Sequence, residues 1–275
     1  MVHSVIVGIG AAGFSAAETI RRHKVDAAIT LLTDDPHGYY SRPGLAYALT
    51  DEVPQKQLEP IQRNRWKELG IEQVKGQAVR LRPQSREVIL ADGRRLAYDA
   101  LLLATGARAV TPDLPGVDLE GVVVLDSMED TQSILRLARR TREAVVIGGG
   151  ITALELVEGL RAQQVSVHYL MRGTRFWRSV LDETESRIVE QRLAHEGVHI
   201  HTHTEIARIV GKRDWRGRQR VAGVETRAGE VIPCQMLGVA IGVRPRLELT
   251  AGTNIAVDRG ILVNGRLGTS VPGIY

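Results

Sequence analysis

Residues 4–17 read SVIVGIGAAGFSAA, in which an apolar strand breaks into a glycine-rich turn and then into a helical pattern. Gly8 suits the left-handed turn that leaves the strand, because glycine carries no Cβ. Gly10 lets the backbone approach a pyrophosphate closely, and Gly13 allows the helix to pack against the strand. The free N–H groups and the positive dipole end of the helix would face that anion. This arrangement predicts the binding site of a dinucleotide.

The next part of the chain agrees with that prediction. A second apolar strand is expected at 28–32, and it ends in Asp34 and Asp35, about twenty residues beyond the last glycine, where an acid suits a ribose 2′-hydroxyl. The turn at 37–49 would lie beside the pyrophosphate. Arg42 in this turn could reach the pyrophosphate as a cation, or it could order the turn as a surface residue. The order strand, glycine turn, helix, strand predicts an α/β fold.

The same order of elements occurs a second time. In the first half, a meander and a returning strand are expected within 76–103, and they end in the ATGAR stretch. In the second half, Gly148, Gly150 and Ala153 occupy the three fingerprint positions. The other elements predicted there are strands at 144–147, 165–170, 198–203 and 236–240, helices at 126–141, 152–163 and 185–196, and a meander within 205–233. Internal duplication explains the match and predicts two dinucleotide sites.

Composition limits the chemistry that the chain can carry out. Cys234 is the only cysteine, so an internal disulfide, a CxxC redox pair and a cysteine-based metal site are excluded. Any redox chemistry must therefore come from a bound cofactor, and two dinucleotide sites suggest that one dinucleotide reduces the other. No apolar run is long enough to span a membrane, and no leader pattern precedes the first strand, so we expect a cytoplasmic protein.

The chain is basic, with a formal net charge of +4 and a pI near 9.4. Basic clusters at 136–142 and 212–220 are interpreted as solvated faces rather than docking patches, and aromatic residues make up only 4% of the chain, so nucleic-acid binding is not expected. The alternation of His199, His201 and His203 predicts one shared strand face, but no further ligand type supports a metal site there. The three tryptophans, Trp66, Trp177 and Trp215, are interpreted as packing or loop residues.

Longer stretches of the sequence carry a family resemblance. They include VGIGAAGFSAA, YSRPGL, LLLATGAR, PGVDLEGV, VVIGGGITALE, VLDETES, AIGVRP and GILVNGRLGTSVPGIY. Together these stretches resemble the two-dinucleotide-binding flavoprotein family of pyridine-nucleotide oxidoreductases. Within it they are most similar to the branch of rubredoxin and ferredoxin reductases and of the flavin module of assimilatory nitrite reductase.

The resemblance implies an α/β fold of two Rossmann-like three-layer dinucleotide-binding domains, each with a β-meander, the second inserted into the first. The implied domains are an FAD-binding domain at 1–111 that resumes at 243–275, and an NAD(P)H-binding domain at 112–242. The implied FAD-binding residues are Gly8, Gly10, Ala11, Ala12, Gly13, Asp34, Asp35, Arg42, Pro43, Val79, Ala104, Thr105 and Gly106. The implied NAD(P)H-binding residues are Gly148, Gly150, Ile151, Glu155, Arg172, Arg175 and Gly242.

Two of these assignments concern the nicotinamide nucleotide. Glu155 occupies the position of an acid that in relatives lies near nicotinamide and flavin, and an acid favoured by the helix dipole is the alternative explanation. Met171 stands where relatives of the NADH type carry Glu, and Arg172 and Arg175 lie close by in the sequence. Because an arginine at the end of the second strand accommodates a 2′-phosphate, NADPH is expected to serve at least as well as NADH.

The sequence also departs from the family pattern. The cysteines of the thiol-dependent branches are absent, which excludes thiol-based catalysis, and the turn after Pro43 lacks the lysine found in many relatives that reduce iron–sulfur carriers. The sequence stops at Tyr275, where relatives continue into an AxGD stretch and an interface domain. We therefore expect the natural gene to be longer, the 275-residue chain to hold FAD weakly, and any homodimer to form through the missing domain.

Three functions are compatible with these features. The first is a flavin-dependent oxidoreductase that transfers hydride from NAD(P)H to FAD and passes electrons to a separate acceptor, such as a small acidic redox protein. The second is the flavin module of a larger nitrite- or sulfur-compound reductase. The third is a non-catalytic nucleotide-binding or interaction protein that has lost the flavin.

Overall fold

A computed structural model describes residues 2–61 and 63–275. The chain divides into two compact units. Unit 1 consists of Met1–Ser41, Glu59–Arg108 and Arg244–Tyr275, and unit 2 consists of Arg42–Leu58 and Ala109–Val243. The chain leaves unit 1 through β8 (Ala107–Ala109) and returns through β17 (Val243–Pro245), and these two strands pair with each other. The larger segment of unit 2, Ala109–Val243, is therefore inserted in the chain of unit 1, and Arg42–Leu58 is a second, shorter insertion.

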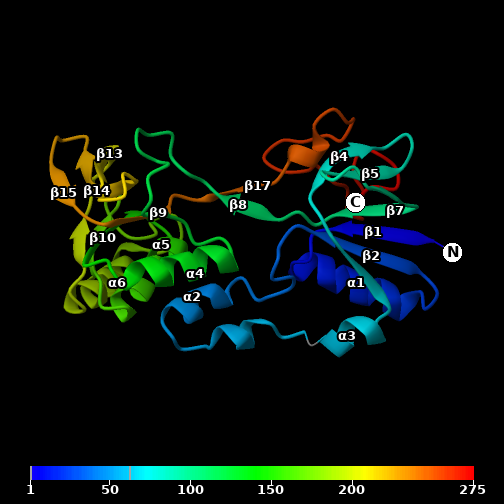
Figure 1. Cartoon of the computed structure of the whole chain (residues 1–275), viewed down its shortest axis with the longest axis horizontal. Coiled ribbons are helices and arrows are strands. Elements are labelled where there is room, and N and C mark those ends of the chain that lie inside the picture. Colours follow the sequence, from blue (N-terminus) through cyan, green and yellow to red (C-terminus); the bar gives the residue numbers. More distant parts are fainter. Residues whose placement is uncertain (1, 62) are drawn as a thin grey trace. The chain divides into compact units, whose positions relative to one another are not determined.

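Unit 1 is built on a parallel four-stranded sheet in the order β3-β2-β1-β7 (Figure 1). Its helices and sheet strands are β1 (His3–Val7), α1 (Ala11–His23), β2 (Ala28–Thr33), α3 (Arg63–Glu68), β3 (Ile71–Lys75) and β7 (Ala100–Leu103). The meander consists of β4 (Ala78–Arg82), β5 (Glu87–Leu90) and β6 (Arg95–Ala97), and a 3₁₀ helix, η2, spans Glu248–Thr250. Val5 of the central strand β1 lies opposite Thr30 and Leu101.

Unit 2 repeats this plan with a parallel five-stranded sheet in the order β12-β11-β10-β16-β9. The strands of this sheet are β9 (Val122–Val123), β10 (Glu143–Gly148), β11 (Ser166–Leu170), β12 (His199–His201) and β16 (Met236–Ala240). The helices are α2 (Gly44–Leu49), η1 (Gln55–Leu58), α4 (Met128–Ala138), α5 (Ile151–Ala162) and α6 (Glu183–His195). The meander consists of β13 (Ile206–Arg213), β14 (Gln219–Thr226) and β15 (Val231–Pro233).

The alternation of buried residues along β10 places one layer on each face of the sheet of unit 2. Val146 packs with residues of α5 such as Leu156, whereas Val145 packs with residues of the meander such as Val224. Successive side chains of a strand point to opposite faces, so an all-apolar strand such as β10 is covered on both sides. In unit 1, Ile6 packs with α1 and Val5 with the meander in the same way. Each unit thus has three layers, with the sheet in the middle.

Residues 42–58 lie with unit 2, although the sequence-based boundary at 111 assigns them to the first domain. Leu49 of α2 packs against α5 at Gly159, where a Cβ would lie 2.6 Å from the Leu49 Cβ. The Gln163 side chain donates a hydrogen bond to the Leu49 carbonyl at 3.0 Å. These contacts join segments more than a hundred residues apart, which sequence periodicity does not reveal.

Two helices begin at capping residues that the periodicity did not identify. Ser127 and Asp130 form a capping box at α4, and Asp182 and Glu185 form another at α6. In each box the side chain of the first residue accepts the backbone N–H of the second, and the acid of the second accepts the backbone N–H of the first. The predicted starts at 126 and 185 are therefore wrong by two residues, because the caps fix the first turn.

Candidate functional site

The first glycine turn joins β1 to α1 in unit 1. Gly8 has a φ of +112°, and a Cβ at this position would overlap the Ala104 carbonyl oxygen of the adjacent strand end. A Cβ at Gly13 would overlap the Gly8 carbonyl oxygen, so the helix and the strand end are packed as closely as the backbone allows. A Cβ at Gly10 would meet nothing within 4 Å. Gly8 and Gly13 are thus required by packing, while Gly10 faces open space at the start of the helix.

The second glycine turn, between β10 and α5, has the same construction in unit 2. Gly148 has a φ of +151°, and a Cβ there would overlap the Ala240 carbonyl oxygen at the end of β16. The third fingerprint position is Ala153, which is fully buried. Gly149 faces open space, whereas a Cβ on Gly150 would lie 3.9 Å from the indole ring of Trp177. The second turn is therefore open on one side and bounded by an aromatic ring on the other.

Both helices that follow these turns begin without a cap. Gly10 and Gly150 are the N-cap residues of α1 and α5, neither helix receives a side-chain cap, and neither has an acid in its first turn. In contrast, α4 and α6 each have a capping box and two acids in the first turn. The first N–H groups of a helix need acceptors from outside the helix, and the helix dipole favours a negative one. The N-termini of α1 and α5 therefore suit an anion such as a pyrophosphate.

A cleft of about 800 Å³ surrounds the second glycine turn. It is lined by the turn itself at 148–152, by the end of β11 at 170–173, and by the end of β16 at 239–243. Because the carboxyl ends of β10, β11 and β16 lie at one edge of a parallel sheet, the cleft occupies the position where open α/β sheets bind ligands. The residues predicted to bind NAD(P)H that line this cleft are Gly148, Gly150, Ile151, Arg172, Arg175 and Gly242.

Four arginines line this cleft: Arg172, Arg175, Arg178 and Arg227. Arg172 is exposed, and Arg175 is half-buried with an Nε that has no acceptor in the described part of the chain. Met171, between the end of β11 and Arg172, is fully buried. The strand end therefore presents positive charge to the cleft and no carboxylate of its own.

Glu155, which the family resemblance places near the nicotinamide, lies one turn further along α5 and does not line the cleft as the described residues define it. The side chain is half-buried, and burial raises the pKa of its carboxyl above the ordinary value. Burial also raises the pKa of Glu158, where the negative charges of Glu196, Glu155 and Glu52 add to the effect.

The acids at the end of β2 in unit 1 differ in their contacts. Asp34 is exposed. The carboxylate of Asp35 accepts hydrogen bonds from the His37 backbone N–H at 2.9 Å and from the Tyr40 hydroxyl at 3.0 Å. Asp35 therefore orders the loop after β2, and Asp34 is the acid that remains accessible to a ribose.

The other residues predicted for FAD are spread over both units. Ala11 and Ala12 are exposed in the first turn of α1. Ala104 follows β7, the Thr105 hydroxyl donates to the Arg246 carbonyl at 3.0 Å, and Gly106 has a φ of +68°. Val79 lies on β4 with an exposed side chain.

Arg42 and Pro43 belong to unit 2. The Arg42 guanidinium donates a hydrogen bond to the Asp126 carbonyl at 2.6 Å, and Pro43 is the N-cap residue of α2. Arg42 thus ties the segment that precedes α2 to the loop before α4. The sequence left two roles open for Arg42, contacting the pyrophosphate or ordering the turn. This hydrogen bond is of the second kind.

The prediction that three alternating histidines share a strand face is wrong. β12 ends at His201, and His203 lies in a turn with a φ of +51°. The neighbour that the sequence missed is His168 on β11. Its Nδ1 lies 3.1 Å from Nε2 of His201, and its ring stacks on the ring of His199 with the two centroids 4.9 Å apart. Within the described residues, no group of three or more His, Cys, Asp or Glu side chains is arranged to hold a metal ion.

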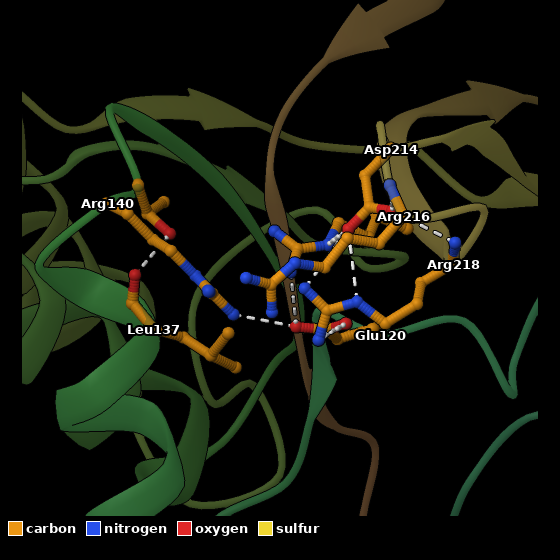
Figure 2. Close-up of polar contacts among 8 residues, drawn as sticks. Glu120, Leu137, Arg140, Asp214, Arg216 and Arg218 are labelled. Atoms are coloured by element: carbon orange, nitrogen blue, oxygen red, sulfur yellow. Dashed lines mark hydrogen bonds and ion pairs between the residues drawn. The ribbon is translucent and has the colours of Figure 1, made fainter.

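The two predicted basic clusters meet at acids in unit 2, as Figure 2 shows. Glu120 pairs with Arg140 at 2.7 Å, with Arg220 at 3.1 Å and with Arg218 at 3.4 Å. Asp214 pairs with Arg220 at 2.9 Å and with Arg218 at 3.1 Å. Partly exposed pairs of this kind each contribute about 0–1 kcal/mol. The pairing supports the interpretation of these clusters as solvated faces.

Cys234 is fully buried under the meander of unit 2, as expected for a small apolar core residue. Burial raises the pKa of its thiol to about 12, so thiolate is scarce at neutral pH. Among the described residues, no helix has the length and apolar character that a membrane crossing requires.

Solved structures and curated proteins resemble this chain along its full length. The crystal structure of the ferredoxin reductase for the CYP199A2 system from Rhodopseudomonas palustris superposes with a TM-score of 0.93 at 28% identity, covering 100% of this chain and 67% of that one. The predicted fold class, two Rossmann-like three-layer domains with the second inserted into the first, is thereby confirmed.

Among curated proteins, rhodocoxin reductase from Rhodococcus erythropolis is 33% identical over 269 residues, which cover 96% of this chain and 61% of the relative. The nitrite reductase [NAD(P)H] of Bacillus subtilis (strain 168) is 30% identical over 273 residues, covering 98% of this chain and 33% of the relative. The chain thus spans between one third and two thirds of the length of these relatives. The family model described as pyridine nucleotide-disulphide oxidoreductase matches residues 2–275, and the chain belongs to that family.

Proposed function

We propose that this chain is the part of a flavin-dependent NAD(P)H oxidoreductase that holds both dinucleotides. In this proposal the FAD-binding domain comprises 1–111 and 243–275, and the NAD(P)H-binding domain comprises 112–242. The observation that carries the proposal is that each unit has a strand, a glycine turn and an uncapped helix in succession; α2 also lacks a side-chain cap, but it does not follow a strand and a glycine turn. The two helices that follow glycine turns start without caps, while α4 and α6 cap themselves.

The residues at both turns fit such groups. A Cβ at Gly10 or Gly149 would stand in otherwise open space, so these glycines leave room for a phosphate against the backbone. When bound, the two cofactors supply the redox chemistry, a hydride transfer from the nicotinamide to the flavin. The protein then has to bind and orient the two dinucleotides.

In unit 1, the N–H groups at the start of α1 would donate hydrogen bonds to the FAD pyrophosphate, and the Asp34 carboxylate would accept hydrogen bonds from the hydroxyls of the adenosine ribose. Asp35 keeps the loop behind Asp34 ordered through its bonds to His37 and Tyr40. The Thr105 bond to the Arg246 carbonyl holds the strand end beside Gly106.

In unit 2, the N–H groups at the start of α5 would donate hydrogen bonds to the pyrophosphate of NAD(P)H within the cleft of about 800 Å³. The cleft offers Arg172 and Arg175 to the adenosine ribose and no carboxylate at the end of β11. A guanidinium binds a phosphate through charge-assisted hydrogen bonds. NADPH, which carries a 2′-phosphate, is therefore the nucleotide that this cleft favours.

The electron acceptor is proposed to be a separate small redox protein. The relatives include reductases named for ferredoxin and rhodocoxin. A second candidate is a module within a larger nitrite reductase, because the match covers 98% of this chain but only a third of the Bacillus subtilis enzyme.

An anaerobic absorbance titration tests the proposed function. The chain is mixed with a smaller amount of FAD, so that most of the flavin is bound even at weak affinity, and NADPH is then added, with FAD and NADPH alone as the blank. We expect flavin bands that bleach on addition of the nucleotide. Bound flavin that stays oxidised in the presence of bound NADPH would contradict the redox function and favour a nucleotide-binding protein. Gly10→Val, which fills the open space at the first turn, should leave the flavin oxidised while retaining NADPH binding.

A further inference from the structure

We propose that Trp177 is a positioning residue for the pyrophosphate of the nicotinamide dinucleotide, and that its indole N–H is a hydrogen-bond donor to that group. The inference rests on the proposed function of unit 2, because it assigns a further contact in the same cleft. The sequence predicts only a packing or loop role for this tryptophan.

The backbone of Trp177 is tied to the second glycine turn. Its N–H donates to the Gly149 carbonyl at 2.8 Å, and its own carbonyl accepts from the N–H groups of Val180 at 2.9 Å and Leu181 at 3.0 Å. These bonds hold Trp177 at a φ of +43°, a left-handed conformation that is rare for a bulky residue. Strain of this kind persists only where the surroundings enforce it, and it is common at binding sites.

The indole ring of Trp177 lies beside the uncapped N-terminus of α5. Cδ1 and Nε1, the edge of the ring that carries the N–H, both lie 3.9 Å from the position of a Cβ on Gly150, the N-cap residue of α5. Phe176 supports the ring with its own ring centroid 6.1 Å away, and the helix-side core of unit 2 packs against it. The ring is therefore held from behind, and its N–H edge lies beside the N-terminus that we assign to the pyrophosphate.

The indole N–H is available for such a contact. Within the described part of the chain, no acceptor is hydrogen-bonded to Nε1, although Trp177 is half-buried and lines the cleft. A partly buried tryptophan normally finds a partner for this donor. A phosphate oxygen is a strong acceptor, and a hydrogen bond to a charged group is stronger than one between neutral groups.

The test compares two probes, NADP⁺ and 2′-AMP, by isothermal titration calorimetry. The first contains the pyrophosphate, and the second contains only the phosphorylated adenosine. We expect Trp177→Phe to weaken NADP⁺ binding about tenfold and to leave 2′-AMP binding unchanged. Trp177→His, which keeps a ring N–H and tolerates a positive φ, should recover most of the lost affinity. Trp215→Phe is the matched control, because Trp215 is 85% exposed in the β13–β14 hairpin.

A second measurement leaves Trp177 in place. In the double variant Trp66→Phe/Trp215→Phe, Trp177 is the only tryptophan, and NADP⁺ should quench its fluorescence and shield it from iodide. Unchanged fluorescence and iodide access with NADP⁺ bound, or equal NADP⁺ affinity in Trp177→Phe and wild type, would overturn the inference while leaving the proposed function standing. Failure of the wild type to bind NADP⁺, NAD⁺ and 2′-AMP would instead overturn the proposed function.

Discussion

The two glycine turns share a backbone and differ in the side chains around it. Each turn leaves a central strand through a glycine with a positive φ that packs on a neighbouring strand end, and each opens an uncapped helix. Around the first turn Gly10 faces open space and the next strand ends in acids. Around the second, Trp177 bounds Gly150 and the next strand ends in arginines.

This difference separates what any dinucleotide requires from what selects one of them. The shared backbone supplies N–H groups and room for a pyrophosphate, which FAD and NAD(P)H have in common. The acids of unit 1 suit an unmodified ribose, and the arginines of unit 2 suit a phosphorylated one. A duplicated framework can therefore serve two different cofactors through a few side chains at the strand ends.

The largest effect is expected from a Cβ at the packed glycines. Gly148→Ala forces a side chain against the Ala240 carbonyl and a φ of +151° on a residue that cannot adopt it comfortably. Overlap and backbone strain together should lower the free energy of unfolding by about 3 kcal/mol. Thermal unfolding of the variant measures this loss. Gly149→Ala is the matched control, since its Cβ meets nothing within 4 Å, and equal melting temperatures for the two variants would show that packing does not fix the turn.

We expect Arg172 and Arg175 to make the cleft of unit 2 bind NADPH more tightly than NADH. Arg172→Ala and Arg175→Ala should each weaken NADPH binding about tenfold, the loss of one charge-assisted contact, and leave NADH binding nearly unchanged. Dissociation constants for both nucleotides decide the point. Arg187→Ala on α6 serves as a control, because Arg187 pairs with Glu183 on the helix surface and does not line the cleft. Loss of NADH and NADPH affinity in equal measure would contradict a role in recognising the 2′-phosphate.

The capped helices provide the converse test. Asp182→Ala removes the cap of α6 and should lower the free energy of unfolding by about 1 kcal/mol, or the melting temperature by roughly 2–4 °C, with no change in nucleotide affinity.

Gly150→Asp places a carboxylate at the open end of α5. We expect it to keep the fold and abolish NADPH binding, because the new charge takes the place of the phosphate and repels it. Retention of NADPH affinity by Gly150→Asp would mean that the nucleotide does not use this helix end.

The smallest effect concerns pH. Burial, followed by the charges of His199 and His201, lowers the pKa of His168. The folded chain therefore binds this proton less readily than the unfolded chain, whose histidine titrates near 6.5. The stability that depends on neutral His168 is complete above about pH 6.5 and declines as the pH falls below it. Melting temperatures between pH 8 and pH 5.5 should fall less in His168→Gln than in the wild type, and parallel curves would contradict this.

The sequence predicted those parts of the fold that have local signals. The glycine turns, both meanders and the return strand at 236–240 follow from glycine spacing and apolar alternation, and the structure has them there. The capping boxes were also visible in principle, since Ser127 and Asp182 are each followed by an acid three residues later. Apolar periodicity alone does not locate the helix starts, because a cap is defined by polar residues outside the periodic pattern.

The rest depends on contacts between distant segments. His168 meets His201 only because β11 and β12 pair in a particular register. Trp177 reaches Gly150 because a loop of irregular backbone folds back onto the glycine turn. Residues 42–58 join unit 2 through Leu49 and α5. No pattern within a short window of sequence contains such information.

Hydrogen–deuterium exchange of the whole chain, with and without each cofactor, tests most directly whether the uncapped N-termini of α1 and α5 hold the two dinucleotides. It reports on the N-termini of α1, α4, α5 and α6 in one experiment. We predict that FAD slows exchange at residues 10–14, that NADPH slows it at 149–154, and that the capped starts of α4 and α6 change little with either. Equal protection of all four helix starts would contradict the assignment, and so would bound nucleotides that protect neither α1 nor α5.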